Sequence, residues 1–325
     1  MYSSTSSFRT ELKVLLLVVS ALAVCELVVR VFERRLTVDV KAPAISKRLS
    51  EAEGQRVLVL GNSLVRDNVN TDILETEMRA QGVRSIHIEK VYLMNTIVND
   101  WYYAFKHHFV DAGRLPDVLV ICFSYNHLED ATIHRPLIAR YYSSLRDIPQ
   151  IFSEDIPDFN GRVEFLLSRW LASFTHRTDV ERRILDTLIP YYRESVTRIN
   201  DALTDEANKR RGVYQPGYRR FAQLLRMAQN RGVRVIVVAV PVANQYPINP
   251  QIKSTLEANV VTFVDTRKVE GLGKTSFVDG MHMNGDGANV YSRALAHHLV
   301  DYLRPPSTTE TFNSKWSRLI ASHGL

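Results

Sequence analysis

Two short stretches of this 325-residue chain carry residue types that could act together in nucleophilic catalysis. The first, residues 57–64, is an apolar run that leads directly into Ser63. The second, residues 277–287, holds Asp279 and His282 three positions apart on a glycine-bearing loop. A carboxylate at that spacing can reach the imidazole and set its tautomer. A serine at a strand end acts as a nucleophile only if such a base reaches it.

The order of these two stretches resembles the SGNH/GDSL hydrolase superfamily. Gly61-Asn62-Ser63-Leu64 is similar to the first block of that family, and Asp279-x-x-His282 is similar to its last block. The resemblance covers roughly residues 56–130 and 213–304. Three positions after the last block also fit the family: Asn284, Gly287 and Tyr291.

The resemblance implies a role for each residue. It assigns the nucleophile to Ser63, the general base to His282 and the orienting carboxylate to Asp279. It also implies an oxyanion hole, for which Ser63, Asn99 and Asn126 are the candidate donors. The stretch around Asn99 lacks the glycine of the family's second block, and Asn126 is the only match to its third block. No cofactor is implied.

The elements that must position these residues alternate between strands and helices. Strands of continuous apolar residues, separated by amphipathic helices, are typical of a parallel sheet covered on both faces. The pattern therefore predicts an α/β fold, a flavodoxin-like three-layer α/β/α domain with about five strands. The runs that predict the strands are residues 57–60, 86–93, 118–123, 233–240 and 260–264.

The rhythm of strands and helices is interrupted after the third strand. Residues 131–212 are helix-biased and aromatic-rich, which predicts a helical insertion that either forms a lid or platform for substrate or only covers the sheet. The predicted organisation has five parts. They are a stub and membrane anchor (1–35), a stalk (36–55), an SGNH-like catalytic domain (56–130 and 213–304), the helical insertion (131–212) and a C-terminal tail (305–325).

An apolar segment at residues 12–32 predicts an N-terminal transmembrane helix, since about 20 residues cross a bilayer. Glu26 and Arg30 interrupt it at a spacing of four, so they can pair on one helix face. A cleaved signal peptide is the alternative, because Ala21-Leu22-Ala23 resembles a cleavage site. The basic residues after the segment favour a cytoplasmic C-terminal side by charge counting. The likeness of the segment to a signal-anchor favours the opposite orientation.

Composition and motifs exclude several classes. The net charge of +6 is small for a chain of this length. The short arginine-rich triplets in the sequence are typical of solvated helix ends, so no nucleic-acid partner is expected. The cysteines, Cys25 and Cys122, cannot supply a structural zinc site. Zincin, P-loop and dinucleotide-binding patterns do not occur, and the adjacent histidines of predicted helices face different directions, so no metal site is expected.

Three functions remain open. The first is a membrane-anchored acyltransferase that passes an acyl group through Ser63 to a hydroxyl of a cell-envelope or exported polysaccharide. The second is a serine esterase or deacetylase on carbohydrate or lipid esters. The third is a carbohydrate-binding protein on a degenerate SGNH-like scaffold. The resemblance to anchored SGNH-like proteins implies the first, with a carbohydrate acceptor, a membrane-embedded O-acyltransferase as partner and a catalytic domain in the bacterial periplasm or at the outer face of the inner membrane.

Overall fold

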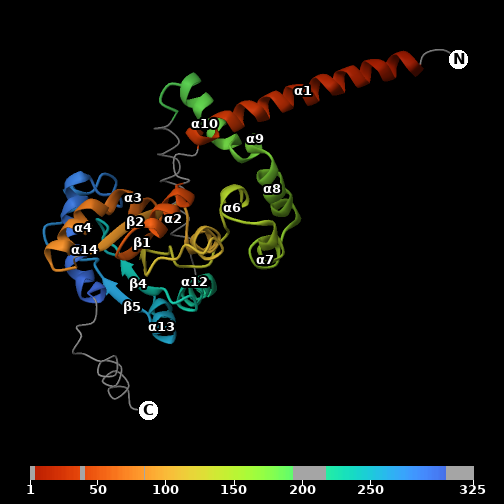
Figure 1. Cartoon of the computed structure of the whole chain (residues 1–325). Helices are drawn as coiled ribbons and strands as arrows, with labels where there is room; N and C mark the ends of the chain where they lie inside the picture. The colour runs from red at the N-terminus through yellow and green to blue at the C-terminus, as the bar shows by residue number, and fades with distance from the viewer. Residues whose placement is uncertain (1–3, 37–40, 84, 193–216, 305–325) are drawn as a thin grey trace. The chain divides into compact units, whose positions relative to one another are not determined.

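The computed structural model describes residues 4–36, 41–83, 85–192 and 217–304, and the chain folds as two compact units (Figure 1). Each unit is assembled from separate stretches of sequence. The first unit comprises Met1–Pro43, Thr96–Ala112 and Glu129–Phe221, and the second comprises Ala44–Asn95, Gly113–Leu128 and Ala222–Leu325. The predicted tail at 305–325 lies outside the described residues.

A five-stranded parallel sheet forms the centre of the second unit. Its strand order, β2-β1-β3-β4-β5, is that of the flavodoxin-like doubly wound fold. The fold class and the strand positions predicted from the sequence are confirmed, with some strand ends displaced by one or two residues. The strands are β1 (Gln55–Gly61), β2 (Ile86–Tyr92), β3 (Val118–Phe123), β4 (Arg234–Ala239) and β5 (Thr262–Asp265).

Both faces of the sheet are apolar and buried over its three central strands, β1, β3 and β4. On one face, Val59, Val120 and Ile236 belong to a core that also contains side chains of helices α3, α4 and α14. Residues of the opposite face, such as Leu58 and Leu119, are also fully buried. This burial explains the continuous apolar runs of the strands. The helical elements of this unit are α2 (Ala42–Glu51), α3 (Ser63–Asn68), α4 (Thr71–Ala80), α13 (Pro250–Ala258), η3 (Lys274–Ser276) and α14 (Gly285–Leu303).

The stretch expected to be a stalk, residues 36–55, differs from that expectation. Residues 42–51 form helix α2, in which Ile45 and Leu49 are buried. Arg48 of the same helix bonds the carboxylate of Glu89 on β2 at 2.7 and 2.9 Å. The apolar residues of this stretch recur at a helical spacing, so most of it packs into the second unit rather than spanning open solvent.

All regular secondary structure among the described residues of the first unit is helical, with loops between the helices. This unit contains the predicted insertion (131–212), of which residues 193–212 lie outside the described part of the chain. It also takes in residues 96–112, which the sequence analysis assigns to the catalytic domain. Helix α12 (Arg219–Gln229) begins in this unit and continues into the second. The other elements are α1 (Ser4–Leu36), α5 (Val98–Phe105), the π-helical turn η1 (Lys106–Val110), α6 (Arg135–Tyr141), η2 (Leu145–Asp147), α7 (Ile148–Glu154), α8 (Phe159–Trp170), α9 (Ala172–Thr175) and α10 (Arg177–Leu188).

A buried ion pair lies in the core of the first unit. The guanidinium of Arg220, fully buried, contacts the carboxylate of Asp155, which is 1% exposed. Arg220 also donates to the hydroxyl of Tyr103 at 2.7 Å and lies over the ring of Tyr102. A buried charge is tolerated only when paired and hydrogen-bonded, so these contacts specify how α7 packs against α5 and α12.

Helix α1 is long and apolar enough to cross a membrane. Its candidate span, Thr10–Glu33, has 24 residues and a mean hydropathy of 2.5 in its most apolar window. A signal sequence near the N-terminus meets the same criteria of length and composition, so α1 fits both a membrane anchor and a signal sequence. The predicted apolar segment at 12–32 therefore forms one continuous helix, as a membrane-spanning segment requires.

Candidate active site

Ser63 lies at the carboxyl end of β1, as the first residue of helix α3. Asn62 caps this helix, because its side-chain oxygen accepts the N–H of Leu64 at 3.1 Å. Gly61 precedes the cap, and a Cβ atom there would lie 2.5 Å from a methyl group of Val65. Glycine is therefore required for the strand to approach the helix this closely. The Ser63 side chain lies at the sheet edge where doubly wound folds bind ligands.

His282 and Asp279 lie on the loop between η3 and α14. The loop closes on itself through the N–H of Val278, which donates to the carbonyl of His282 at 2.8 Å. Gly280 has a positive φ of +84°, a conformation that favours glycine. Its carbonyl accepts the N–H of Ala243 at 2.8 Å, which ties the loop to the segment after β4. One hydrogen bond within the loop and one to the segment after β4 therefore fix the backbone that carries Asp279 and His282.

The structure brings the three predicted residues into one chain of hydrogen bonds. His282 Nε2 lies 2.8 Å from Ser63 Oγ, and His282 Nδ1 lies 2.7 Å from Asp279 Oδ2. The carboxylate selects the tautomer with a proton on Nδ1, which leaves Nε2 to accept the serine proton. This is the geometry of an activated nucleophile, in which a base orients toward a hydroxyl and a carboxylate orients the base.

The Asp279 carboxylate is prepared to remain ionised. Partial burial alone would raise its pKa, but hydrogen bonds from the backbone and imidazole of His282 and from the N–H of Met281 outweigh that effect. Its pKa is therefore lower than the ordinary value. The two backbone bonds, from His282 at 2.8 Å and Met281 at 3.1 Å, both reach Oδ1 and leave Oδ2 for the imidazole.

A second histidine, His127, contacts Asn62, the residue before the nucleophile, and is not among the candidates that the sequence offers. Its ring nitrogens lie 3.3 and 3.2 Å from Asn62 Nδ2, and its Nδ1 accepts the N–H of Ser124 at 3.3 Å. Burial and the neighbouring His282 lower the pKa of His127 to about 4. The ring is therefore neutral at neutral pH. Its place directly after a buried strand is the signal that could have indicated it.

The other predicted donors are placed differently. Asn126 follows β3 in the second unit, one residue after Tyr125, whose φ is +46°. β3 pairs with β1, so Asn126 and Ser63 follow neighbouring strands at the same edge of the sheet. Asn99 belongs to the first unit, where it accepts the N–H of Ala131 at 3.2 Å. Both oxyanion roles stay predictions.

Potential metal ligands cluster in the first unit. Among the described residues, His107, Asp111 and Asp147 place their ligand atoms within 4.8 Å of one another. The ammonium of Lys106 already bonds Asp111 at 2.9 Å and Asp147 at 2.5 Å. A fixed cation between the two carboxylates supplies the charge that a metal ion would bring, so the cluster is explained as an ion-pair network.

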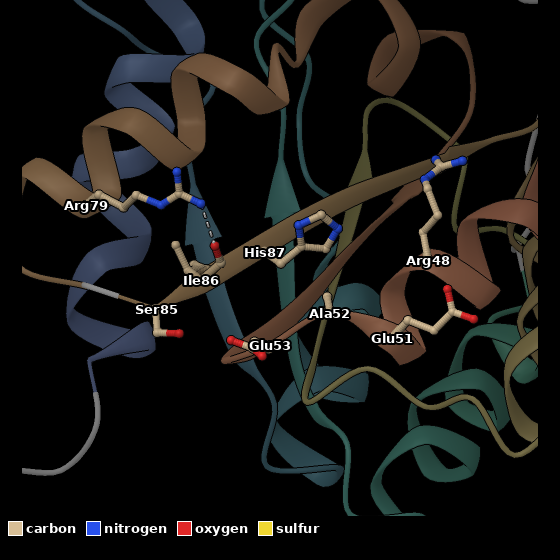
Figure 2. Close-up of a pocket in the computed structure, with 8 residues that line it drawn as sticks. All are labelled: Arg48, Glu51, Ala52, Glu53, Arg79, Ser85, Ile86 and His87. Carbon is tan, nitrogen blue, oxygen red and sulfur yellow. Dashed lines mark hydrogen bonds between the residues drawn. The ribbon is translucent and has the colours of Figure 1, made fainter.

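Two hollows in the second unit lie at opposite ends of the sheet. One, of about 420 Å³, is lined mostly by polar side chains, among them Arg48, Arg79 and His87, at the amino ends of β1 and β2 (Figure 2). That end is opposite to Ser63. The other, of about 530 Å³, includes Phe277 and lies beside the loop that carries His282. Its position makes the second hollow the better candidate for a substrate group.

Comparison with known proteins gives structural similarity only. No family model and no curated protein matches the chain. A lipase/acylhydrolase from Enterococcus faecalis is 14% identical with a TM-score of 0.38, over 78% of this chain and 100% of that chain. A GDSL-like lipase from Bacteroides thetaiotaomicron is 13% identical with a TM-score of 0.38, over 82% and 99%. The acetylxylan esterase Axe2 from Geobacillus stearothermophilus is 11% identical with a TM-score of 0.38, over 76% and 95%.

The likeness of this chain to the GDSL-like lipase and to the acetylxylan esterase is one of fold alone. At TM-scores below 0.5 the likeness decides nothing about activity. The chemistry of this chain is therefore inferred from its own strand order and from the hydrogen bonds among Ser63, His282 and Asp279.

Proposed function

We propose that this protein is an SGNH-type serine acyl-transfer enzyme that carries an acyl group on Ser63. The observation that supports the proposal is the continuous hydrogen-bond chain from Ser63 Oγ through the imidazole of His282 to Asp279. Ser63 and His282 are 219 positions apart in the sequence, yet their side chains are hydrogen-bonded. A serine that only forms a turn would not need this contact.

The proposed reaction has two steps. In the first, Ser63 Oγ attacks the ester carbonyl while His282 Nε2 takes its proton, and the C–O bond to the leaving alcohol breaks as that alcohol receives the proton. In the second, an acceptor hydroxyl gives its proton to His282 and attacks the acyl-serine, and Ser63 recovers a proton as its ester bond breaks. Asp279 stabilises the imidazolium that forms in each step.

We further propose that the acceptor is a carbohydrate hydroxyl of a cell-envelope or exported polysaccharide, and that a membrane-embedded O-acyltransferase supplies the acyl group. The membrane-spanning length of α1 and the resemblance to anchored SGNH-like proteins support this reading. The catalytic domain would then lie outside the cytoplasm.

Hydrolysis is the second candidate, because the base and its partner are open to water. The side chain of Asp279 is 55% exposed and that of His282 is 27% exposed. A transferase must shield its acyl-serine from water, whereas an esterase needs water at this position. The exposure of Asp279 and His282 therefore favours an esterase or deacetylase. A substrate that covers their loop, and so shields the acyl-serine from water, would instead favour transfer.

The test uses the full chain in detergent with a chromogenic acetyl ester. The wild type should form an acetylated Ser63, detectable by mass spectrometry of the trapped enzyme, and Ser63→Ala should lose both the adduct and turnover. Turnover that rises with added oligosaccharide, with acetyl found on the sugar, supports the transferase. Turnover independent of sugar supports the esterase. Without adduct or turnover, the acyl-transfer proposal fails, and the carbohydrate-binding scaffold is the hypothesis that is left.

Placement is tested separately in cells. A reporter fused to the C-terminus should be active only if it is exported, and Ser63→Ala should abolish polysaccharide acylation without changing the protein level. A reporter active only in the cytoplasm would contradict the proposed orientation. Unchanged acylation in the variant would contradict the proposed acceptor.

A further inference from the structure

Helix α1 divides into two parts with different surroundings. Side chains of residues 10–25 are exposed, as for Leu17 at 70% and Leu22 at 64%. From residue 26 onward, Glu26, Val29 and Glu33 are half-buried at spacings of three and four. That spacing defines one helix face, so the last turns of the candidate membrane span pack against protein of the first unit.

The half-buried face is held by polar contacts with the end of α8 and with α9. Glu26 accepts the N–H groups of Ala172 and Ser173, each at 2.9 Å. Arg30 bonds the Glu26 carboxylate at 2.6 Å and donates to the carbonyl of Trp170 at 2.8 Å. Glu26 and Arg30, the charged pair that interrupts the apolar segment, therefore form hydrogen bonds with backbone groups at the junction of α8 and α9. Polar groups with internal partners of this kind are tolerated at membrane depth.

Helix geometry places these contacts within the depth of a bilayer. The uninterrupted apolar residues, 14–25, number 12 and rise about 18 Å at about 1.5 Å per residue. The hydrocarbon core of a bilayer is about 30 Å thick. A bilayer that covers α1 must therefore extend past Cys25 toward Glu33, and so past the position of α9.

The surface beside these contacts is apolar. An open groove of about 560 Å³ runs between α1 and α10, with Val24 and Val28 on one side and Ile184 and Leu185 on the other. Further large apolar side chains at the end of α8 and at and after the end of α10 are exposed. They are Trp170 (60%), Leu171 (39%), Leu188 (71%), Ile189 (45%) and Tyr191 (76%).

We propose that residues 170–191, the interfacial segment, lie in the bilayer leaflet that receives the C-terminal end of α1, with lipid acyl chains filling the groove. The inference rests on the proposed membrane anchor. Continuity with the anchor identifies the occupant, because the segment hydrogen-bonds the span itself. The segment begins with an exposed tryptophan and ends with an exposed tyrosine, the two residue types that are enriched at the membrane interface.

The charges of α10 indicate how the segment binds. Arginines and acids balance in this helix, with three of each. Attraction to anionic lipid therefore contributes little, and the apolar side chains determine the depth of the segment. We expect the same depth in zwitterionic and anionic bilayers.

Helix α8 offers a matched pair of positions for the test. Phe159 at its start and Trp170 at its end are both exposed, at 77% and 60%, but only the second lies beside α1. The experiment uses the full chain with Cys25→Ser and single cysteines at Leu17, Phe159, Trp170 or Leu188; Cys122 is buried. Each variant is labelled with a fluorescent maleimide and reconstituted in phosphatidylcholine vesicles with or without brominated acyl chains. Circular dichroism verifies that each variant folds.

Brominated lipid should quench labels at Leu17, Trp170 and Leu188 about two-fold or more, and leave the label at Phe159 unchanged. Quenching at Leu17 without quenching at Trp170 and Leu188 would overturn the interfacial segment while keeping the anchor. If labels at Leu188 quench one another and brominated lipid has no effect on them, the surface would instead bind a second copy of the chain. Absence of quenching at Leu17 would overturn the anchor and, with it, this proposal.

Discussion

Asn68 joins the helix that begins at Ser63 to the loop that carries His282, through its contact with Met283. Its Oδ1 accepts the N–H of Met283 at 2.8 Å, and its Nδ2 donates to the carbonyl of Met281 at 3.2 Å. Asn68 is fully buried. One side chain therefore holds the backbone on both sides of the proposed base.

Asn68→Ala should lower kcat about 10–100-fold with little change in KM, because a small displacement of the base from the nucleophile is costly in rate. Asn68→Asp keeps the acceptor for the Met283 N–H and should recover part of the loss. Steady-state kinetics with a chromogenic acetyl ester measure both variants. Wild-type kcat in Asn68→Ala would show that the loop holds His282 without it.

Asp279→Asn should lower kcat by about 10⁴, as expected when the orienting carboxylate is lost and the wrong tautomer is favoured. The amide oxygen can still accept the backbone N–H groups, so the loop should keep its shape. Single-turnover kinetics measure the rate of acylation, and circular dichroism serves as the control for folding. A loss smaller than tenfold would contradict the role proposed for this carboxylate.

Asn126→Ala should lower kcat about 10²–10³-fold if its side chain donates to the oxyanion, with KM little changed. Asn99→Ala tests the other predicted donor by the same kinetics. A loss of unfolding free energy with normal kcat would instead assign Asn99 to its contacts with Ala131 and Asp155. Normal kcat in Asn126→Ala would exclude that side chain from the hole.

His127 should make stability pH-dependent. Its pKa in the fold is about 4, against 6.5 when unperturbed, so between these values the unfolded chain binds the proton and stability falls as pH falls. The shift corresponds to at most about 3 kcal/mol, because the imidazole is not completely shielded from solvent. Urea unfolding between pH 7 and 4 should show a shallower loss in His127→Gln than in wild type. Parallel curves would contradict the assignment.

Asp155→Asn should destabilise the first unit by up to about 3–5 kcal/mol, because it removes the buried partner of the Arg220 guanidinium and leaves it only the partly exposed carboxylate of Glu154. Asp301→Asn is the matched control, since its carboxylate is 77% exposed. Urea unfolding of both variants measures the difference, which should be near zero for the control. Similar unfolding free energies for the two variants would show that the buried pair is dispensable.

Local patterns in the sequence were sufficient for much of the fold. Continuous apolar runs identify the central strands β1, β3 and β4 because these are buried on both faces. The edge strands β2 and β5 are only partly buried and have shorter apolar stretches, and the closing helix is recognisable from its own periodicity. Asp279 and His282 could be paired in advance because they lie three residues apart and meet through one loop. Such features depend on neighbours in the chain.

Other relationships depended on tertiary structure. Three contacts join residues that are far apart in the sequence. Ser63 and His282 are 219 positions apart, and Asn62 and His127, which follow β1 and β3, are 65 apart. Glu26 and Ala172 of α9 are 146 positions apart. These contacts depend on the order of the strands in the sheet and on how the buried faces pack. The hydrophobic periodicity of a single segment predicts neither of these. The sequence alone therefore determined which side chains could perform the chemistry, and the packing of distant segments decided which of them meet.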